Sequence, residues 1–307
     1  MQAAPATPSS SPVLAIAADI KLAHSVFALP FALLAAALAY AAAPSMTMQQ
    51  ALLALMAVVG CMVCARTYAM TLNRRLDAAI DAQNPRTATR AIPAGRVSNR
   101  QMSIAAGLSA AGLVLGAAAF WPILNNPWPL AASPLVLLVL GIYPLTKRVT
   151  WLCHAVLGLA LALSPLAAAL AIHPPSLAAS WPWWLAAGVL AWVAGFDILY
   201  ALQDVATDRR DGVYSLPASL GVRPALFISR GLHLASAFLF LEAGLKNERL
   251  GFYYLAAVCV TVPVLILEHF LTATGKTDKL PIAFGTLNGI IAILLGIAGA
   301  VDLILTV

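Results

Sequence analysis

The sequence carries little charge. Only 10% of its 307 residues are charged, with 12 Asp and Glu against 18 Lys and Arg, while 62% are hydrophobic and the mean hydropathy is +0.88. A soluble core of this length would need far more polar cover, so the composition predicts a polytopic membrane protein. Residues 1–12 lack the basic region of a signal peptide. We expect a short disordered tail there, and a single domain over residues 13–307.

Cysteine is also scarce. Cys61 and Cys64 form a CxxC pair inside an apolar stretch, with no nearby histidine or second pair. Packing on a helix face is therefore favoured over a redox or zinc site. The five histidines are scattered along the chain, and we expect them to be hydrogen-bonded packing residues that bind no ligand and form no cluster: His24, His154, His173, His233 and His269.

Long apolar stretches fill most of the chain. A membrane-spanning helix needs about 20 residues, and nine stretches are long enough: 14–43, 48–81, 100–121, 129–146, 151–172, 181–209, 223–244, 250–272 and 281–305. A Pro-Ala turn follows an acidic helix end in each half, at Pro93 and at Pro217. We therefore expect an all-α bundle around a central cavity, made of two pseudo-repeat four-helix halves plus a ninth helix.

The basic residues gather on one side of the predicted membrane. Thirteen of them lie on the side reached after the second, fourth, sixth and eighth spans: Arg74, Arg75, Arg86, Arg90, Arg96, Arg100, Lys147, Arg148, Arg209, Arg210, Arg223, Lys276 and Lys279. Only Lys246 and Arg249 lie opposite. The positive-inside rule makes the basic side cytoplasmic, with the N-terminus inside and the C-terminus outside. Because topology explains the net charge of +6, no nucleic-acid partner is expected.

Half of the acidic residues fall in or beside two clusters at the ends of long spans. The first cluster is Asn73, Asp77 and Asp81, and the second is Asp197, Asp204 and Asp208. Their spacings of four and seven residues predict that each cluster lies along one helical face.

Carboxylates near a membrane are costly, about 2.5 to 3.5 kcal/mol each at its centre, so these clusters need a counter-charge. Divalent cations that carry a phosphorylated ligand would supply it. Mg²⁺ prefers one or two carboxylates plus substrate phosphates. The predicted metal ligands are Asp77, Asp81, Asp204 and Asp208, and the predicted substrate is a lipid diphosphate.

Several motifs resemble the UbiA-type family of intramembrane polyprenyl transferases, from about residue 19 onward. The family's first motif, Asn-Asp-x-x-Asp-x-x-x-Asp, is matched by Asn73, Asp77 and Asp81, with Arg74 at the position of its first aspartate. The second motif, Tyr-x-x-x-Asp-x-x-x-Asp, is matched at Tyr200, Asp204 and Asp208. The segments 86–95 and 143–148 are also similar to family segments.

The Arg74 variant, the first span and the segment from Asp197 to Asp208 are similar to a branch labelled 4-hydroxybenzoate polyprenyltransferase. That branch includes enzymes of the futalosine route to menaquinone, which prenylate 1,4-dihydroxy-6-naphthoate. The resemblance implies Mg²⁺-dependent transfer of a polyprenyl chain to an aromatic acid, in ubiquinone or menaquinone biosynthesis. We expect the cytoplasmic loop at about 82–99, which holds three arginines, Pro93 and Gly95, to cover the diphosphate. Acceptor, chain length and oligomeric state stay open.

The remaining candidate residues follow from this chemistry. Asp197 is our candidate for activating the acceptor hydroxyl. Candidate substrate-binding residues are Asn73, Arg66, Arg74, Arg86, Arg90, Tyr143, Lys147, Arg148 and Tyr200. Arg66, Lys147 and Arg148 are candidates for the acceptor carboxylate, although Arg66 is equally well interpreted as a partner of Asp197 or of a helix carbonyl. Asn288, polar in an apolar span, is expected to line the cavity.

Two other classes compete with this hypothesis. An ion- or proton-coupled transporter also uses intramembrane acids and paired halves, but these acids cluster toward one face and no broken helix is evident in both halves. A CDP-alcohol phosphotransferase also uses aspartate pairs, but its Asp-Gly-x-x-Ala-Arg signature precedes neither cluster.

Overall fold

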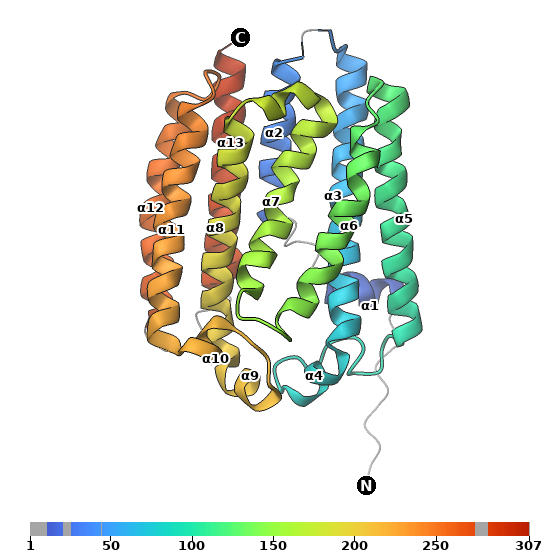
Figure 1. Cartoon of the computed structure of the whole chain (residues 1–307), viewed down its shortest axis with the longest axis vertical. Helices are drawn as coiled ribbons and strands as arrows, with labels where there is room; N and C mark the ends of the chain where they lie inside the picture. The colour runs from blue at the N-terminus through green and yellow to red at the C-terminus, as the bar shows by residue number, and fades with distance from the viewer. Residues whose placement is uncertain (1–10, 21–25, 44, 274–281, 307) are drawn as a thin grey trace.

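The computed structural model describes residues 11–20, 26–43, 45–273 and 282–306. Over these ranges the chain is helical, without strands, as predicted. The long helices run side by side in one bundle (Figure 1). The predicted tail falls largely outside the described residues, as do His24, Lys276 and Lys279. Helix α1 (Pro12–Asp19) begins where the Ser11 hydroxyl accepts the Leu14 N–H at 3.3 Å.

Eight segments of the described chain are long and apolar enough to cross a membrane. They contain α3 (Met48–Leu76), α5 (Asn99–Leu124), α6 (Trp128–Thr146), α7 (Cys153–Ile172), α8 (Trp181–Ala201), α11 (Val222–Leu245), α12 (Phe252–Ala273) and α13 (Asn288–Leu305). Shorter turns lie beside α7 and α13, at η2 (Pro174–Ala178) and η5 (Ile282–Leu287). The chain is a multi-pass membrane protein. The predicted count of nine spans is not confirmed.

The first predicted span is the exception. Within 14–43 the structure places α1 and then α2 (Leu29–Ala41), in place of one continuous helix. Pro30 lies in the first turn of α2, where its missing N–H leaves no hydrogen bond unmade. The 13 residues of α2 rise about 20 Å, which is short of a hydrocarbon core of about 30 Å.

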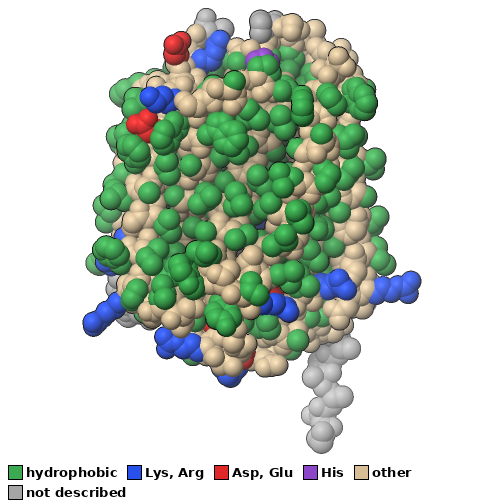
Figure 2. Space-filling view, in the orientation of Figure 1, with side chains coloured by type: hydrophobic (Ala, Val, Ile, Leu, Met, Phe, Trp, Pro, Cys, Tyr) green, Lys and Arg blue, Asp and Glu red, His purple; other side chains and the backbone are tan. Residues whose placement is uncertain are grey.

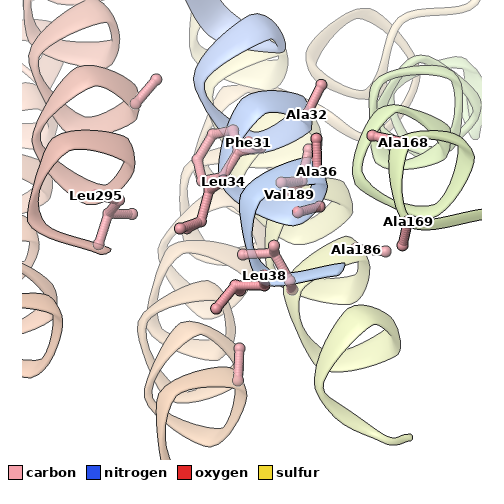
Figure 3. Packing of buried hydrophobic residues seen from close by; sticks show 14 of the residues in the cluster. Phe31, Ala32, Leu34, Ala36, Leu38, Ala168, Ala169, Ala186, Val189 and Leu295 are labelled. Atoms are coloured by element: carbon pink, nitrogen blue, oxygen red, sulfur yellow. The ribbon is translucent and has the colours of Figure 1, made fainter. Parts of the chain in front are cut away.

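Helix α2 forms the centre of the bundle. Phe31 and Ala32 are fully buried, and Leu34 and Leu38 are nearly so. Figure 3 shows these side chains among residues of α7, α8 and α13. Helices α7 and α8 also approach closely, because a Cβ on Gly158 would lie 2.5 Å from the Leu190 carbonyl oxygen. This tight core fixes α7 and α8, whose ends carry polar residues discussed below.

The CxxC pair serves packing, as predicted. A Cβ on Gly116 of α5 would lie 2.7 Å from Cys61 Sγ, and one on Gly112 would lie 2.8 Å from Cys64 Sγ. Both thiols are free. Helices α3 and α5 therefore pack closely where the two cysteine sulfur atoms of α3 lie against these glycines of α5.

The two segments that lead to the acidic clusters end differently. The predicted helix over 48–81 is interrupted at Asp77, whereas the predicted segment 181–209 stays helical within one span, Trp181–Asp211. Helix α3 stops at Leu76, and Asp77 (φ −88°, ψ 0°) joins it to the short α4 (Ala78–Gln83). Helix α8 passes through a 3-10 turn, η3 (Leu202–Asp204), into α9 (Val205–Asp211). The break at Asp77 and the 3-10 turn at Leu202–Asp204, which is tighter than an α-helical turn, therefore prevent the acids of each cluster from following one straight α-helical face.

The segment boundaries after the clusters agree with the sequence. Asn84 is extended (φ −101°, ψ 117°) directly before Pro85, as a residue preceding proline prefers. Gly212 ends α9 in the left-handed conformation (φ +67°), which glycine adopts at little cost. The chain then enters the short α10 (Leu216–Leu220).

The short helices α4, α9 and α10 gather at one end of the bundle, which we call the polar end (Figure 1). The space-filling view shows mainly apolar side chains across the middle of the visible face and several Lys and Arg side chains near this end (Figure 2). Both acidic clusters therefore lie at the same end, as predicted.

Candidate active site

The first cluster places two buried carboxylates at the polar end. Asp77, 1% exposed, accepts a hydrogen bond from Lys147 Nζ, and its Oδ1 lies 3.7 Å from an Arg148 guanidinium nitrogen. Arg90 Nη1 donates to the Asp81 carboxylate and lies 2.7 Å from each of its oxygens. Both carboxylates are therefore paired with cations: Asp77 with Lys147 and Arg148 at the end of α6, and Asp81 with Arg90 in the loop after α4.

In the second cluster, Asp204 is bound by residues of the same loop, which follows α4. Arg86 donates to both oxygens of Asp204, at 3.0 Å from Nε and 2.6 Å from Nη2, and Asn84 adds a bond of 3.1 Å. Arg86 Nη1 also donates to the Tyr200 hydroxyl at 3.2 Å. Burial lowers the pKa of Arg86, but the hydrogen bonds to Asp204 and the nearby negative charges outweigh it and raise that pKa above its usual value.

The two clusters meet across the bundle. Arg86 lies within electrostatic range of Asp81 as well as Asp204, and Lys147 within range of Asp208 as well as Asp77. Arg210 of α9 donates to the Gln83 carbonyl of α4 at 3.1 Å. The structure thus brings the predicted metal ligands and loop cations to one region, although they come from segments more than 100 residues apart.

The carboxylates suit an Mg²⁺ ion that takes only one or two protein ligands, and they do not form a complete ligand shell by themselves. Among the described residues, no group of three or more His, Cys, Asp or Glu side chains is placed to hold a metal. Oxygen Oδ1 of Asp77 is buried and accepts no hydrogen bond within the described ranges, which leaves a ligand oxygen available. Mg²⁺ commonly takes one or two carboxylates and completes its shell with phosphate and water, so the donor set fits substrate-linked metal.

Arg74 forms its ion pair with an acid outside its own motif. Its Nε lies 3.4 Å from Asp19 Oδ2, and both side chains are nearly buried. Asp19 Oδ1 also accepts the Ala91 N–H at 3.0 Å, so α1 is tied both to α3 and to the loop. Sequence reasoning missed Asp19, since a single aspartate before the first span carries no pattern.

Asn73 and Tyr143 form a polar contact beneath the first cluster. Asn73 Nδ2 donates to the Tyr143 hydroxyl at 3.1 Å, and that hydroxyl in turn lies 3.4 Å from the Ala69 carbonyl oxygen. Arg66 donates to the Ile20 carbonyl at 3.3 Å. Of the interpretations given to Arg66, the structure shows the carbonyl partner.

An apolar cavity of about 390 Å³ begins at these residues. Arg66 and Tyr143 are among its few polar lining groups, while alanine, leucine and other apolar side chains of α3, α5, α6 and α7 form most of the wall. Its lining on α6 runs from Tyr143 back to Pro129, a rise of about 21 Å along the helix. The cavity therefore extends from the polar end deep into the span region, with room for a long apolar chain.

Asp197 is paired with a histidine that the sequence did not single out. His154 Nδ1 lies 2.6 Å from Asp197 Oδ2, and His154 is 4% exposed. His154 is thus a buried, hydrogen-bonded residue, as expected, but its partner was not predicted, because residues 43 positions apart gave no local signal of their contact.

A second buried polar group lies away from the cavity. Trp192 Nε1 donates to Asn288 Oδ1 at 2.7 Å, and Asn288 Nδ2 donates to Glu268 Oε1 at 2.7 Å. The rings of His233 and His269 lie 4.9 Å apart beside Glu268. Asn288 is thus a bonding partner within the core and not a cavity-lining residue, and the histidines do form a cluster. Both predictions are corrected.

Comparison with known proteins agrees with this geometry. Residues 28–301 match the UbiA prenyltransferase family. The chain belongs to the UbiA prenyltransferase family. Among solved structures, a UbiA homologue from Aeropyrum pernix K1 is 31% identical with a TM-score of 0.75, covering 92% of this chain and 98% of that one.

Other UbiA relatives are more distant or match in part. The 4-hydroxybenzoate octaprenyltransferase of Edwardsiella ictaluri is 29% identical over 219 residues, 69% of this chain and 71% of that protein. A polyprenyl transferase, ntnF, of a Nectria species is 30% identical over 194 residues, 62% of this chain and 61% of its own length. The structure of an Archaeoglobus fulgidus UbiA homologue bound to DMAPP and Mg²⁺ has a TM-score of 0.65 at 18% identity, covering 94% and 98% of the two chains. This last likeness concerns the fold.

Proposed function

We propose that this UbiA-family protein transfers a polyprenyl chain from a polyprenyl diphosphate to a hydroxylated aromatic carboxylate, with Mg²⁺ as cofactor. The candidate acceptors are 4-hydroxybenzoate and 1,4-dihydroxy-6-naphthoate, which serve ubiquinone and menaquinone biosynthesis. One observation carries the proposal: the apolar cavity begins at Arg66 and Tyr143, beneath the region where both acid clusters and the loop cations meet. A donor with a charged head and a long apolar tail matches that arrangement.

The head group would lie between the two clusters. Asp77 and Asp81 on one side, and Asp204 and Asp208 on the other, would hold Mg²⁺, which neutralises the diphosphate and makes it a better leaving group. Arg86, Arg90 and Lys147 are already placed beside these acids, and would bind phosphate oxygens directly. Stabilising the departing charge promotes cleavage of the allylic C–O bond.

The acceptor ring would then attack the allylic cation at the mouth of the cavity. Water must be kept out because it would trap the cation. The loop of residues 84–98 supports this role, since Arg86 and Arg90 tie it to Asp204 and Asp81. Arg66, Lys147 and Arg148 are the candidates for binding the acceptor carboxylate, and Asp197 is the candidate base for its hydroxyl.

A direct assay tests the proposal. Purified protein in liposomes receives Mg²⁺, a labelled polyprenyl diphosphate and one of the two acceptors. We expect Mg²⁺-dependent formation of a prenylated aromatic acid together with diphosphate release. An ion- or proton-coupled transporter would release no diphosphate, and that result with both acceptors would contradict the proposal. The two acceptors in parallel also identify the preferred ring.

A further inference from the structure

His154 makes two hydrogen bonds that together define its chemical state. Nitrogen Nδ1 lies 2.6 Å from Asp197 Oδ2 of α8, and Nε2 lies 3.1 Å from the backbone nitrogen of Leu216 at the start of α10. A backbone N–H can only donate, so Nε2 is the acceptor and carries no proton. The proton of a neutral imidazole therefore sits on Nδ1 and is donated to Asp197.

The same two bonds define Asp197. As the acceptor from Nδ1–H, its carboxylate is held through Oδ2 in one orientation. Its other oxygen, Oδ1, has no hydrogen-bond partner among the described residues, and the side chain is 23% exposed, whereas that of His154 is 5% exposed. Asp197 thus presents one free carboxylate oxygen on a fixed support, which is the geometry of a general base with an orienting partner.

His154 has close neighbours at both the apolar cavity and the second acid cluster. Leu157 and Leu161 line the cavity, and they stand three and seven residues after His154 on α7, hence on its face. On the other side, Ser215, next to Leu216, donates to Asp208 Oδ2 at 2.6 Å. One turn of chain, Ser215–Leu216, therefore contacts both a proposed metal ligand and the imidazole that orients Asp197.

We propose that His154 is a positioning residue that holds Asp197 as the base for the acceptor hydroxyl; this inference rests on the proposed prenyl transfer. The hydroxyl proton passes to Asp197 Oδ1, and the electron pair left on oxygen activates the ring. The allylic C–O bond breaks, and diphosphate departs with the electron pair of that bond. The activated ring carbon then supplies the electron pair of a new C–C bond to the allylic cation. The ring C–H proton passes to the released diphosphate, which restores aromaticity, and Asp197 returns its proton to the oxygen.

Two substitutions at position 154 separate positioning from packing. His154→Leu fills the space but cannot donate to Asp197. His154→Asn keeps an amide N–H near the position of Nδ1 and can still donate. Asp197→Asn removes the base itself. We expect His154→Leu to lower kcat by about tenfold to a hundredfold, as misplacement of a catalytic group does, and Asp197→Asn by about a hundredfold or more. His154→Asn should lose clearly less than His154→Leu.

An acceptor with a fluorinated ring provides a readout that a structural defect would not move. Fluorine lowers the hydroxyl pKa, so the acceptor ionises with less help from a base. The ratio of wild-type to variant kcat should shrink with the fluorinated acceptor for both His154→Leu and Asp197→Asn. The KM for the polyprenyl diphosphate should stay near the wild-type value in all three variants.

The outcomes divide cleanly. Wild-type kcat in His154→Leu, or equal losses in His154→Leu and His154→Asn with the same ratio for both acceptors, would overturn the positioning role. If the wild-type protein itself transfers no prenyl chain to either acceptor, the proposed function fails instead. Failure of the positioning role is therefore measured in the variants, and failure of the proposed function is measured in the wild-type protein, in the same assay.

Discussion

Arg86 and Asp204 are joined by two hydrogen bonds, of 3.0 and 2.6 Å, although 118 residues separate them in the chain. Arg86 belongs to the loop after the first acid cluster, and Asp204 belongs to the second. The contact therefore connects the loop of the first half to the second half of the bundle. It also positions the cations of the loop where a diphosphate would bind.

Substituting Arg86 tests that contact. Arg86→Gln removes the paired N–H groups, so we expect a higher KM for polyprenyl diphosphate and a kcat/KM at least about tenfold lower, as loss of a charge-assisted pair implies. Arg86→Lys should not restore it, because one ammonium cannot replace the guanidinium fork. Arg100→Gln, an exposed position at the start of α5, is the matched control. Equal kinetics in Arg86→Gln and Arg100→Gln would refute this role.

The cavity predicts dependence on chain length. Ala132 lines it, whereas its exposed neighbour Ala131 does not. Ala132→Phe should block the deep part of the cavity, so kcat/KM should fall more for long polyprenyl diphosphates than for short ones. The measurement compares donors of increasing length, with Ala131→Phe as control. A uniform loss across all lengths would show that the tail does not occupy this cavity.

Asp302 stabilises the opposite end of the bundle. Its carboxylate accepts the backbone N–H groups of Gly251, Tyr253 and Tyr254 at 2.9, 3.2 and 2.7 Å, so it caps the first turn of α12 from a different helix. Asp302→Ala should lower the free energy of unfolding by about 1–3 kcal/mol, since buried N–H groups lose their acceptor. Thermal unfolding in detergent measures this. Asp302→Asn, which keeps one acceptor oxygen, should lose less, and an unchanged Tm in Asp302→Ala would contradict the assignment.

The distribution of basic residues predicts the orientation in the membrane. With the polar end cytoplasmic, an alkaline phosphatase reporter after Val307 should be active because it lies outside. The same reporter fused after Arg148, at the polar end, should be inactive. The opposite pair of activities would place the acid clusters on the outer face.

The sequence predicted the parts of the site that repeat a local pattern. The acids at Asp77, Asp81, Asp204 and Asp208 recur at regular spacing in otherwise apolar stretches, and Asn84–Pro85 and Gly212 mark chain turns by their backbone preferences. These features depend on neighbours within a few residues. They were therefore visible without the fold.

The partners of those acids were not predictable in the same way. His154 pairs with Asp197, Asp19 with Arg74, and Asp302 caps α12, each across a large sequence separation. No periodicity marks such pairs, because they arise only when packed helices bring two segments together. The helix break at Asp77 was missed for a related reason: apolar and helix-forming residues continue through it, and the cations that bond there, Lys147 to Asp77 and Arg148 to the Leu76 carbonyl, come from a distant segment.

The central claim is that the two acid clusters jointly promote Mg²⁺-dependent cleavage of a polyprenyl diphosphate. Diphosphate release should be measured for the wild-type protein, for Asp77→Asn and Asp204→Asn, and for Glu248→Gln, an exposed acid near the opposite end. We predict that each aspartate variant loses about a hundredfold or more in turnover, while Glu248→Gln keeps the wild-type rate. Full Mg²⁺-dependent turnover in both Asp77→Asn and Asp204→Asn would contradict the account.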